Sequence, residues 1–465
     1  MDLRLDIFEL ADRYRKAELT PSEVVSTCLD RIRAFDTKMG AFQLLTADVA
    51  TKAAAKADDA FTRREAVGPL LGIPFSVKDI YDIQGYVTGK GQSRTGQPIA
   101  DKSATVVNRL LSAGAILLGK TKTVEIAMGG WGVNKALGTP WNPWDVATHR
   151  VPGGSSSGSA VAVAAGFSAF ALGTDTGGSV RLPAAFCGVT GLNVTANCLP
   201  TEGIMPLSPT LDTPGPITRT ILDAAILFEV MGGRTPSLIS RDLSSGSGLC
   251  GTLHRGIAID GLRIGAINDQ ERDVCTAEIL HAYDSAIEDL RRLGATVERI
   301  SPQRTYAEIA ANIGALINAE AFEFHGAYYR SPEFPVEEYV RERVLAGARV
   351  SAATQQRILD ERSEIQSAFQ RDIQEFDALT TPTTPTTAIP VAEVDGAVNA
   401  AHFTRPFNFL GMCAVAVPIG LTSMGLPTSL QIAARSGNEE MALRISAAFE
   451  RERGPIGNPP MSQLY

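Results

Sequence analysis

Two clusters of glycine and serine lie close together in the chain and contain the residues best suited to nucleophilic chemistry. The first cluster spans residues 152–159 (PGGSSSGS) and the second spans residues 173–181 (GTDTGGSVR). Glycines in such loops let the backbone approach a substrate closely. The amides of Thr176, Gly177, Gly178 and Ser179 could converge on one point, as an oxyanion requires. The alternative is that both clusters are ordinary turns, in which Gly and Ser are common.

A serine nucleophile needs a base, and lysine is the candidate that the sequence offers. The five histidines are scattered and none lies in a recognisable motif. Lys78 directly follows the apolar segment Ile73–Val77, so its side chain can leave the edge of a sheet and enter the interior. Burial lowers the pKa of a lysine and leaves it neutral, able to accept a proton. The competing interpretation is a solvated lysine in a loop.

Three familiar motifs occur in contexts that argue against them. Residues 114–121 fit the phosphate-binding pattern G-x-x-x-x-G-K-[ST], but a helix precedes them and their interior, Ala-Ile-Leu-Leu, predicts a buried strand. Asp175-Thr176-Gly177 resembles the triplet of aspartic proteases, which need a second such carboxylate, and the chain has none. Residues 154–158 fit G-x-S-x-G without the apolar strand that must precede a nucleophile elbow, although a serine–histidine triad stays open because histidines lie downstream.

The elements that must position these residues alternate between strand and helix. We expect helices within the first 65 residues, with one capped by Thr20, Pro21 and Glu23, and further helices at 103–113, 159–166, 303–376 and 438–452. Strands are expected at 70–79, 114–120, 169–173, 414–418 and 429–432, with long loops at 129–158 and 380–390. A further α/β stretch that contains a Pro-rich loop is expected to run to about residue 265. This alternation predicts an α/β fold with a large, parallel or mixed sheet covered by helices on both faces. We interpret residues 1–465 as one domain.

Charge and composition argue against nucleic acids, metals and membranes as partners of this protein. The formal charge of −8 and the absence of any run of like charges argue against a surface that binds nucleic acid. The six cysteines have no C-x-x-C pair and the histidines no H-x-x-x-H spacing, so neither a disulfide framework nor a metal site is expected. We expect no signal peptide at the N-terminus, because its first residues are amphipathic and acidic, and the apolar run 160–173 is too short to span a bilayer. We expect a cytoplasmic protein that acts on small molecules.

At the Gly/Ser clusters the chain closely resembles the amidase signature family. The hallmark of that family is a long Gly/Ser-rich stretch, which here runs from Gly153 to Gly188. Other matching segments are residues 72–79, 211–219, 382–385, 407–411 and 425–431. The resemblance covers nearly the whole chain except about 235–375. One departure is Asn193-Val194, where the family usually has Lys-Pro, and we expect this to alter a supporting loop only.

The resemblance implies a role for each site residue. Lys78 matches the catalytic lysine, Ser179 the nucleophile, and Ser155 a bridging serine that follows a cis peptide bond. Three residues match the oxyanion loop, Thr176, Gly177 and Gly178. Three more match positions that support the site by hydrogen bonds, Ser156, Asp175 and Arg181. No cofactor and no metal are implied.

The implied activity is hydrolysis of the C–N bond of a small-molecule amide through an acyl-enzyme on Ser179. The alternative is the glutaminase component of a tRNA-dependent amidotransferase, since such components share the triad. A homodimer stays open, and no membrane partner or direct nucleic-acid contact is expected. Segment 303–376 is expected to form a variable helical layer that shapes the substrate pocket, through Ile313, Leu316, Ile317 or Phe322. The sequence leaves open whether the substrate is an aliphatic, aryl, indole, ureido, hydrazide or lactam compound.

Overall fold

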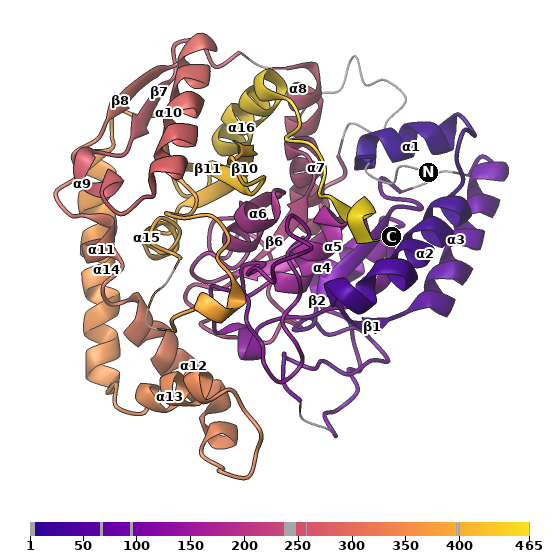
Figure 1. Ribbon diagram of the computed structural model, residues 1–465, viewed down its shortest axis with the longest axis horizontal. Coiled ribbons are helices and arrows are strands. Elements are labelled where there is room, and N and C mark those ends of the chain that lie inside the picture. Colours follow the sequence, from indigo (N-terminus) through magenta and orange to yellow (C-terminus); the bar gives the residue numbers. More distant parts are fainter. Residues whose placement is uncertain are drawn as a thin grey trace.

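A mixed β-sheet runs across the molecule (Figure 1). The computed structural model describes residues 5–65, 68–93, 96–236, 248–256, 258–396, 398 and 400–464. Within them, eleven strands form one sheet in the order β1-β3-β2-β4-β6-β5-β10-β11-β9-β7-β8. The strands are β1 Phe42–Leu45, β2 Pro74–Lys78, β3 Ile116–Thr121, β4 Phe170–Asp175, β5 Thr190–Asn193, β6 Thr213–Thr218, β7 Arg263–Ala266, β8 Thr296–Arg299, β9 Ala378–Pro382, β10 Cys413–Leu421 and β11 Pro427–Ala434. The predicted mixed sheet of an α/β fold is confirmed.

Parallel and antiparallel pairs divide the sheet into regions. The trio β3-β2-β4 is parallel, as is β9-β7-β8 at the far side, whereas β4-β6-β5-β10-β11-β9 pair antiparallel. Because β2 and β4 are parallel neighbours, their carboxyl ends lie at the same edge of the sheet. Lys78 ends β2 and Asp175 ends β4, so the topology brings these two positions together.

Helices pack on both faces of the sheet. The described helices are α1 Ile7–Arg15, α2 Pro21–Met39, α3 Ala47–Thr62, α4 Thr105–Ser112, α5 Ser157–Ala164, α6 Arg181–Cys187, α7 Ile221–Met231, α8 Leu249–Arg255, α9 Asp269–Arg272, α10 Ala277–Arg292, α11 Tyr306–Ile309, α12 Ile313–Tyr329, α13 Glu338–Gly347, α14 Ala352–Asp372, α15 Arg405–Leu410 and α16 Glu439–Arg453. On one face, α5 and α6 contact each other and the central strands. On the other, α7 packs on β5 and β6 and also contacts α4 and α16. Short 3₁₀ turns occur at Glu125–Ala127, Val391–Glu393 and Met461–Leu464.

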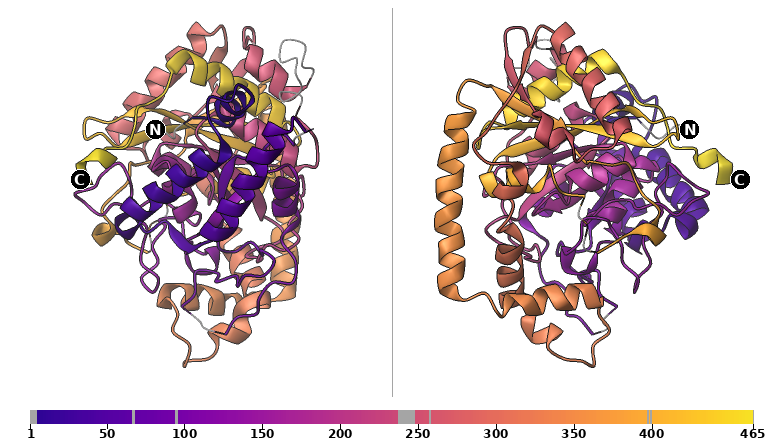
Figure 2. Two further views of the ribbon diagram at one scale, coloured as in Figure 1. Left: turned by 90° about the vertical axis from the view of Figure 1, so that its right-hand side faces the viewer. Right: turned by 60° about the vertical axis from the view of Figure 1, so that its left-hand side comes forward.

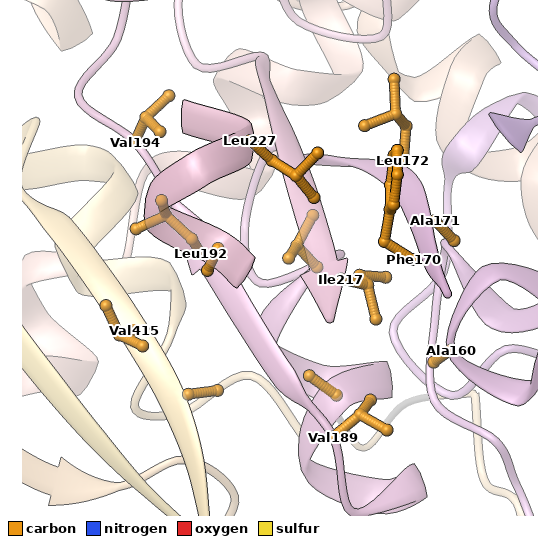
Figure 3. Packing of buried hydrophobic residues seen from close by; sticks show 14 of the residues in the cluster. Ala160, Phe170, Ala171, Leu172, Val189, Leu192, Val194, Ile217, Leu227 and Val415 are labelled. Atoms are coloured by element: carbon orange, nitrogen blue, oxygen red, sulfur yellow. The ribbon is translucent and has the colours of Figure 1, made fainter. Parts of the chain in front are cut away.

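Small residues let α5 and α6 lie close to the strands. A Cβ placed on Gly173 of β4 would meet Ser156 Oγ at 2.5 Å, and one on Gly191 of β5 would meet the Ala184 Cβ at 2.8 Å. Apolar side chains fill the space between elements, and Figure 3 shows part of this core, with Leu172, Leu192, Ile217 and Leu227 coming from β4, β5, β6 and α7. The centre of the sheet is therefore a dry, close-packed support for the loops at its edge.

The predicted cap of α2 is confirmed in detail. Thr20 precedes the helix and its hydroxyl accepts from the Glu23 amide, while the Glu23 carboxylate accepts from the Thr20 amide. Pro21 is the first helical residue, where its missing N–H costs nothing. This reciprocal pair fixes the start of the helix that covers the β1 side of the sheet.

The segment 303–376 is helical, as predicted. It contains α11 to α14, and α12 packs against α13. Figure 2 shows α14, the long orange helix, running along one side of the molecule, with α13 crossing near its lower end. No helix within the described ranges combines the length and the apolar character that crossing a membrane requires.

Two segments that we expected to be loops contain strands. Residues 380–390 begin inside β9, which pairs with β11 and β7; its threonines favour a strand, and Pro382 stands at its end. The Pro-rich segment before residue 265 contains β6, in which Pro214 and Pro216 pair with β4. On its other side β6 pairs with β5 only at Ile217 and Thr218. Pro214 and Pro216, which have no N–H group, are therefore not required to donate a hydrogen bond to β5. The prolines therefore do not prevent strand formation here, because β5 pairs with β6 only beyond them, a feature that the local sequence does not reveal.

Candidate active site

Four segments meet at one edge of the sheet to form the candidate site. Lys78 closes β2, and Thr174 and Asp175 close β4. Ser155 and Ser156 precede α5, and Ser179 precedes α6. The amide of Ser156 donates to the carbonyl of Ser179 at 3.2 Å, which joins the two Gly/Ser clusters directly. The structure therefore brings together the residues that the sequence analysis selected.

Lys78 is fully buried and held by two hydroxyls. Its Nζ donates to Ser155 Oγ at 2.7 Å and to Thr174 Oγ1 at 2.8 Å. Burial lowers the pKa of Lys78 to about 7, although the negative charges of Asp212 and Asp175 act in the opposite direction. No carboxylate in the described part of the chain forms an ion pair with this lysine. Near neutral pH a large fraction of the molecules therefore carries an uncharged amine next to Ser155.

Ser155 lies deeper than Ser179. The peptide bond between Gly154 and Ser155 is cis, as the family resemblance predicts. Ser155 has no solvent exposure and its carbonyl accepts from the Thr123 hydroxyl at 2.9 Å. Ser179 lines a pocket of about 370 Å³ that opens to solvent. The structure thus gives Ser179 access to a small molecule and places Ser155 between that serine's loop and the lysine.

The two serine hydroxyls are not joined by a hydrogen bond among the contacts of the described residues. The link from Lys78 to Ser155 is formed, whereas the link from Ser155 to Ser179 is not. Hydrogen bonds between catalytic groups are often long without substrate and shorten when it binds. The backbone bond between Ser156 and Ser179 already fixes the separation of the two loops.

In the loop that we expect to bind an oxyanion, one backbone amide donates within the protein and three others have no acceptor among the described residues. The Gly178 amide donates to Asp175 Oδ1 at 2.7 Å, so it is occupied within the protein. The amides of Thr176, Gly177 and Ser179 have no acceptor among the described residues. Gly178 has a φ of 123°, and a Cβ there would lie 2.2 Å from Thr404 Oγ1, so only glycine fits. Three amides are therefore free to face the pocket.

Asp175 and Arg181 form a buried ion pair that supports this loop. Arg181 Nη2 lies 2.9 Å from Asp175 Oδ1, and both side chains are fully buried. The carboxylate also accepts from the amides of Gly178 and Val180 and from Asn408 Nδ2. Burial alone would raise the pKa of Asp175, but the Arg181 guanidinium and these donors hold it below its usual range. Asp175 therefore stays ionised and fixes the turn that carries Ser179.

Ser156 and Asn193 support the same region. Ser156 Oγ accepts from the Thr174 amide at 3.3 Å and so ties the first cluster to β4. Asn193, one of the two residues that depart from the family pattern, accepts from Thr213 Oγ1 at 2.9 Å. Thr213 also donates to the Asp175 carbonyl at 2.9 Å. The departure thus lies behind the site, in a supporting position.

Asp212, to which the sequence gives no role, lies beside the loop that we expect to bind the oxyanion. Its Oδ1 accepts from Thr176 Oγ1 at 2.5 Å and its Oδ2 from the amides of Leu207 and Ser208. Burial raises the pKa of Asp212 above its usual value, and the negative charge of Glu320 adds to this. Asp212 lies within the family-like segment 211–219, and Pro214 follows where the triplet of an aspartic protease would require glycine, so the sequence gives it no chemical role.

Glu320 connects the helical layer to this loop. It lies on α12 and is buried, and its carboxylate accepts from the hydroxyls of Ser208, at 2.5 Å, and Thr210. The helix also contributes Ile317 to the wall of the pocket. Of the other three apolar candidates in this segment, Ile313 and Leu316 are buried in the core and Phe322 packs against it, partly buried; none of the three belongs to the wall of this pocket.

The pocket at Ser179 has both apolar and cationic walls. Ala127, Met128, Leu182, Leu207 and Ile317 supply apolar surface, and Gly129, Gly130 and the oxyanion loop supply backbone. Arg343 of α13 and Arg405 of α15 complete the lining, together with Ala401. Neither arginine was selected from the sequence, because each lies more than 150 residues from Ser179 and in no motif with a known anionic partner. No cluster of three His, Cys, Asp or Glu side chains suited to a metal occurs among the described residues.

The chain is similar to known proteins over nearly all of its length. The family described as Amidase matches residues 23–443. A glutamyl-tRNA(Gln) amidotransferase subunit from Chloroflexus aggregans is 36% identical, with 93% of each chain covered. A "2-amino-5-chloromuconic acid deaminase" from Comamonas testosteroni is 32% identical over 98% of this chain and 99% of that one. A solved structure described as an amidase superposes with a TM-score of 0.86 at 30% identity, covering 97% of this chain and all of the other.

Proposed function

Because the chain belongs to the amidase family and is a hydrolase of carbon–nitrogen bonds, we propose that Ser179 forms an acyl-enzyme with a small-molecule amide. The observation that carries this proposal is the contact of 2.7 Å between Lys78 Nζ and Ser155 Oγ inside a buried site. Only a neutral lysine can act as a base, and burial favours the neutral form. The amide is hydrolysed with water to a carboxylic acid and ammonia or an amine.

The proposed reaction begins with two proton transfers. Neutral Lys78 accepts the proton of Ser155, and Ser155 accepts the proton of Ser179 as Ser179 Oγ attacks the amide carbonyl. The amides of Thr176, Gly177 and Ser179 donate to the oxyanion of the tetrahedral intermediate. Loss of one such donor typically costs about 3–4 kcal/mol of transition-state stabilisation. Gly178, which the family resemblance also assigns to this loop, would contribute by shaping the turn, since its amide is bound to Asp175.

The second half of the proposed reaction reverses the proton path. Ser155 delivers the proton to the leaving nitrogen, the C–N bond breaks, and the amine departs. Water then attacks the acyl-enzyme while the same relay accepts its proton, and the acid is released from Ser179. The supporting residues Ser156, Asp175 and Arg181 act by holding the two loops in register.

Replacement of the nucleophile tests this proposal. We expect Ser179→Ala to abolish release of ammonia from amides while leaving the fold intact, because the hydroxyl is small and the loop is held by Asp175. Ser157→Ala is a matched control: its hydroxyl is buried nearby and, among the described residues, donates only to the Lys122 carbonyl, at 3.4 Å. Near wild-type turnover by Ser179→Ala, in protein verified by mass, would remove the assignment of the nucleophile.

The second candidate is the glutaminase component of a tRNA-dependent amidotransferase. It is favoured by the relatives that are named as subunits of glutamyl-tRNA(Gln) amidotransferases. The same site would then hydrolyse glutamine and pass ammonia to a partner protein. Glutamine turnover by the purified chain, together with copurification of partner proteins, supports this alternative. A chain that purifies alone or as a homodimer and prefers other amides supports the stand-alone hydrolase.

A further inference from the structure

Two arginines line the same small pocket as the candidate nucleophile. Arg343 comes from α13 and Arg405 begins α15, and both share this pocket with Ser179. The thirteen residues of the pocket wall, all within the described part of the chain, include no aspartate and no glutamate. The wall that faces a bound substrate is therefore positively charged on one side.

Arg405 lies directly against the loop that precedes Ser179. A Cβ placed on Gly177 would lie 3.2 Å from Arg405 Cγ and 3.7 Å from its Nε. The neighbouring Thr404 hydroxyl donates to the Gly177 carbonyl at 2.9 Å, which fixes the start of α15 against this loop. The guanidinium is thus held within a few ångströms of the amides that face the reacting carbonyl.

Neither arginine has a carboxylate partner among the residues that the structure describes. Arg343 Nη1 donates to the Tyr339 hydroxyl at 2.8 Å, and its guanidinium lies over the Tyr339 ring. Burial, together with the positive charge of Arg343, lowers the pKa of Arg405 to about 10. By contrast, the fully buried Arg181 is paired with Asp175.

Two nearby cations without an anion are unfavourable in a partly buried site, because each is desolvated and they repel each other. The arrangement becomes favourable when a ligand supplies the missing negative charge. Guanidinium groups match the planar, two-oxygen geometry of a carboxylate and bind it in a bidentate manner. The pocket opens to solvent, and its empty space of about 370 Å³, part of which is open solvent, admits a compact acid.

Building on the proposed function, we propose that the substrate is a compact amide whose acyl part carries a free carboxylate, which Arg405 and Arg343 bind while Ser179 attacks the amide carbonyl. The monoamides of short dicarboxylic acids have this chemistry. No acidic residue lies among the described residues of this pocket wall, and Asp212, which contacts the wall residue Thr176, already accepts from that hydroxyl and from two backbone amides. An α-amino acid amide such as glutamine should therefore be a poorer substrate than the same chain without its amino group.

Matched substrate pairs test this inference. We would measure kcat/KM for the monoamides of malonic, succinic and glutaric acid, and for the neutral amides in which a methyl group replaces the carboxylate. The wild-type enzyme should prefer at least one acid over its neutral counterpart by about 100-fold or more, since a site with unpaired charges rejects a ligand that leaves them unpaired. Comparable rates for acid and neutral amides would overturn the inference and leave the amidase proposal standing.

Arginine variants locate the recognition site. Arg405→Gln and Arg343→Gln should each reduce the preference for the acid at least tenfold, and Arg405→Lys should restore part of it, because lysine keeps the charge without the bidentate geometry. Arg357→Gln, an exposed arginine on α14, is the matched control and should leave the preference unchanged. Equal losses with acid and neutral substrates would mean that Arg405 supports the oxyanion loop instead, and would also overturn the inference.

Two measurements separate failure of this inference from failure of the proposed function. Ser179→Ala should still bind succinate, seen as a rise in its melting temperature that the added change Arg405→Gln removes. A fluorophosphonate, which carries no carboxylate, should still label Ser179 in Arg405→Gln. Lack of succinate binding, loss of labelling in that variant, or faster turnover of glutamine than of the glutaric monoamide would each contradict the recognition proposed here. Absence of labelling in the wild type would contradict the nucleophile itself.

Discussion

Thr174 offers a way to change the base without touching the three residues of the proposed relay. Its hydroxyl is one of two acceptors for Lys78 Nζ, at 2.8 Å, and the side chain is buried. Thr174→Val removes this acceptor and keeps the shape of the side chain. The ammonium form of Lys78 depends on its acceptors more than the neutral amine does, because hydrogen bonds to charged groups are the stronger ones. The substitution should therefore lower the pKa of Lys78.

The size of the effect follows from the hydrogen bond that is lost. A bond to a charged group is worth about 1.5–3 kcal/mol and a neutral one about 0.5–1.5 kcal/mol. The difference of about 1–1.5 kcal/mol corresponds to about one pKa unit. Since the pKa of Lys78 in the folded protein is about 7, we expect about 6 in the variant, by the same conversion.

The dependence of kcat/KM on pH measures this change. Activity should rise with pH, because the neutral amine is the base, and the rise should level off above the pKa of Lys78. With a pKa of about 7, a large share of the wild-type molecules carries neutral lysine near neutral pH, whereas a lysine with the ordinary value of 10.5 would be neutral in only about one molecule in three thousand at pH 7. In Thr174→Val the midpoint of the rise should move about one pH unit toward acid, with a lower plateau because Lys78 is less firmly placed.

Thr190→Val is the matched control for this experiment. Thr190 is also a buried threonine in a central strand, but its Oγ1 has no hydrogen-bond partner among the described residues. This control should keep the wild-type profile. A midpoint that stays in place in Thr174→Val, or that moves toward alkaline pH, would show that the rising limb does not report Lys78 and would refute the reasoning.

Two further variants test the relay itself. Lys78→Arg should be as inactive as Ser179→Ala in an ammonia-release assay, because arginine does not lose its proton in a protein; a substantial rate would mean that Lys78 acts through its charge. Ser155→Ala should lose about 10²–10⁴-fold in amide turnover, as is typical for positioned acid–base groups, yet keep slow acylation by activated esters, whose leaving groups need no proton. Peptide mapping should then place a fluorophosphonate adduct on Ser179, and an adduct on Ser155 in the wild type would reverse the two roles.

The residues of the relay were predictable because they lie in short, dense segments of sequence. Lys78 follows a clear apolar strand, and the Gly/Ser clusters carry both serines and the loop between Asp175 and Arg181. The cis bond before Ser155 came from the family resemblance, since glycine and serine do not by themselves signal it. The capping box at Thr20 was readable because all its partners lie within three residues.

The features that the sequence did not predict depend on contacts between segments that are far apart along the chain. Arg181 reaches Gln431 and Asn408, which are 250 and 227 residues away along the chain. Arg405 reaches the loop before Ser179 from a similar distance, and no local pattern marks it as a pocket residue. The strand β9 was missed for a related reason, because its pairing with β11 and β7 outweighs the proline at its end.

In the roles proposed above, the residues that break the bond and the arginines that select the substrate are encoded in different stretches of the gene. Lys78, Ser155 and Ser179 lie within about a hundred consecutive codons, whereas Arg343 and Arg405 are encoded far downstream. A mutation in the downstream stretch alters which molecule is held against Ser179 and leaves the bond-breaking residues as they were. With these roles, a change of one codon for Arg343 or Arg405 can alter the preferred substrate while hydrolysis itself is retained.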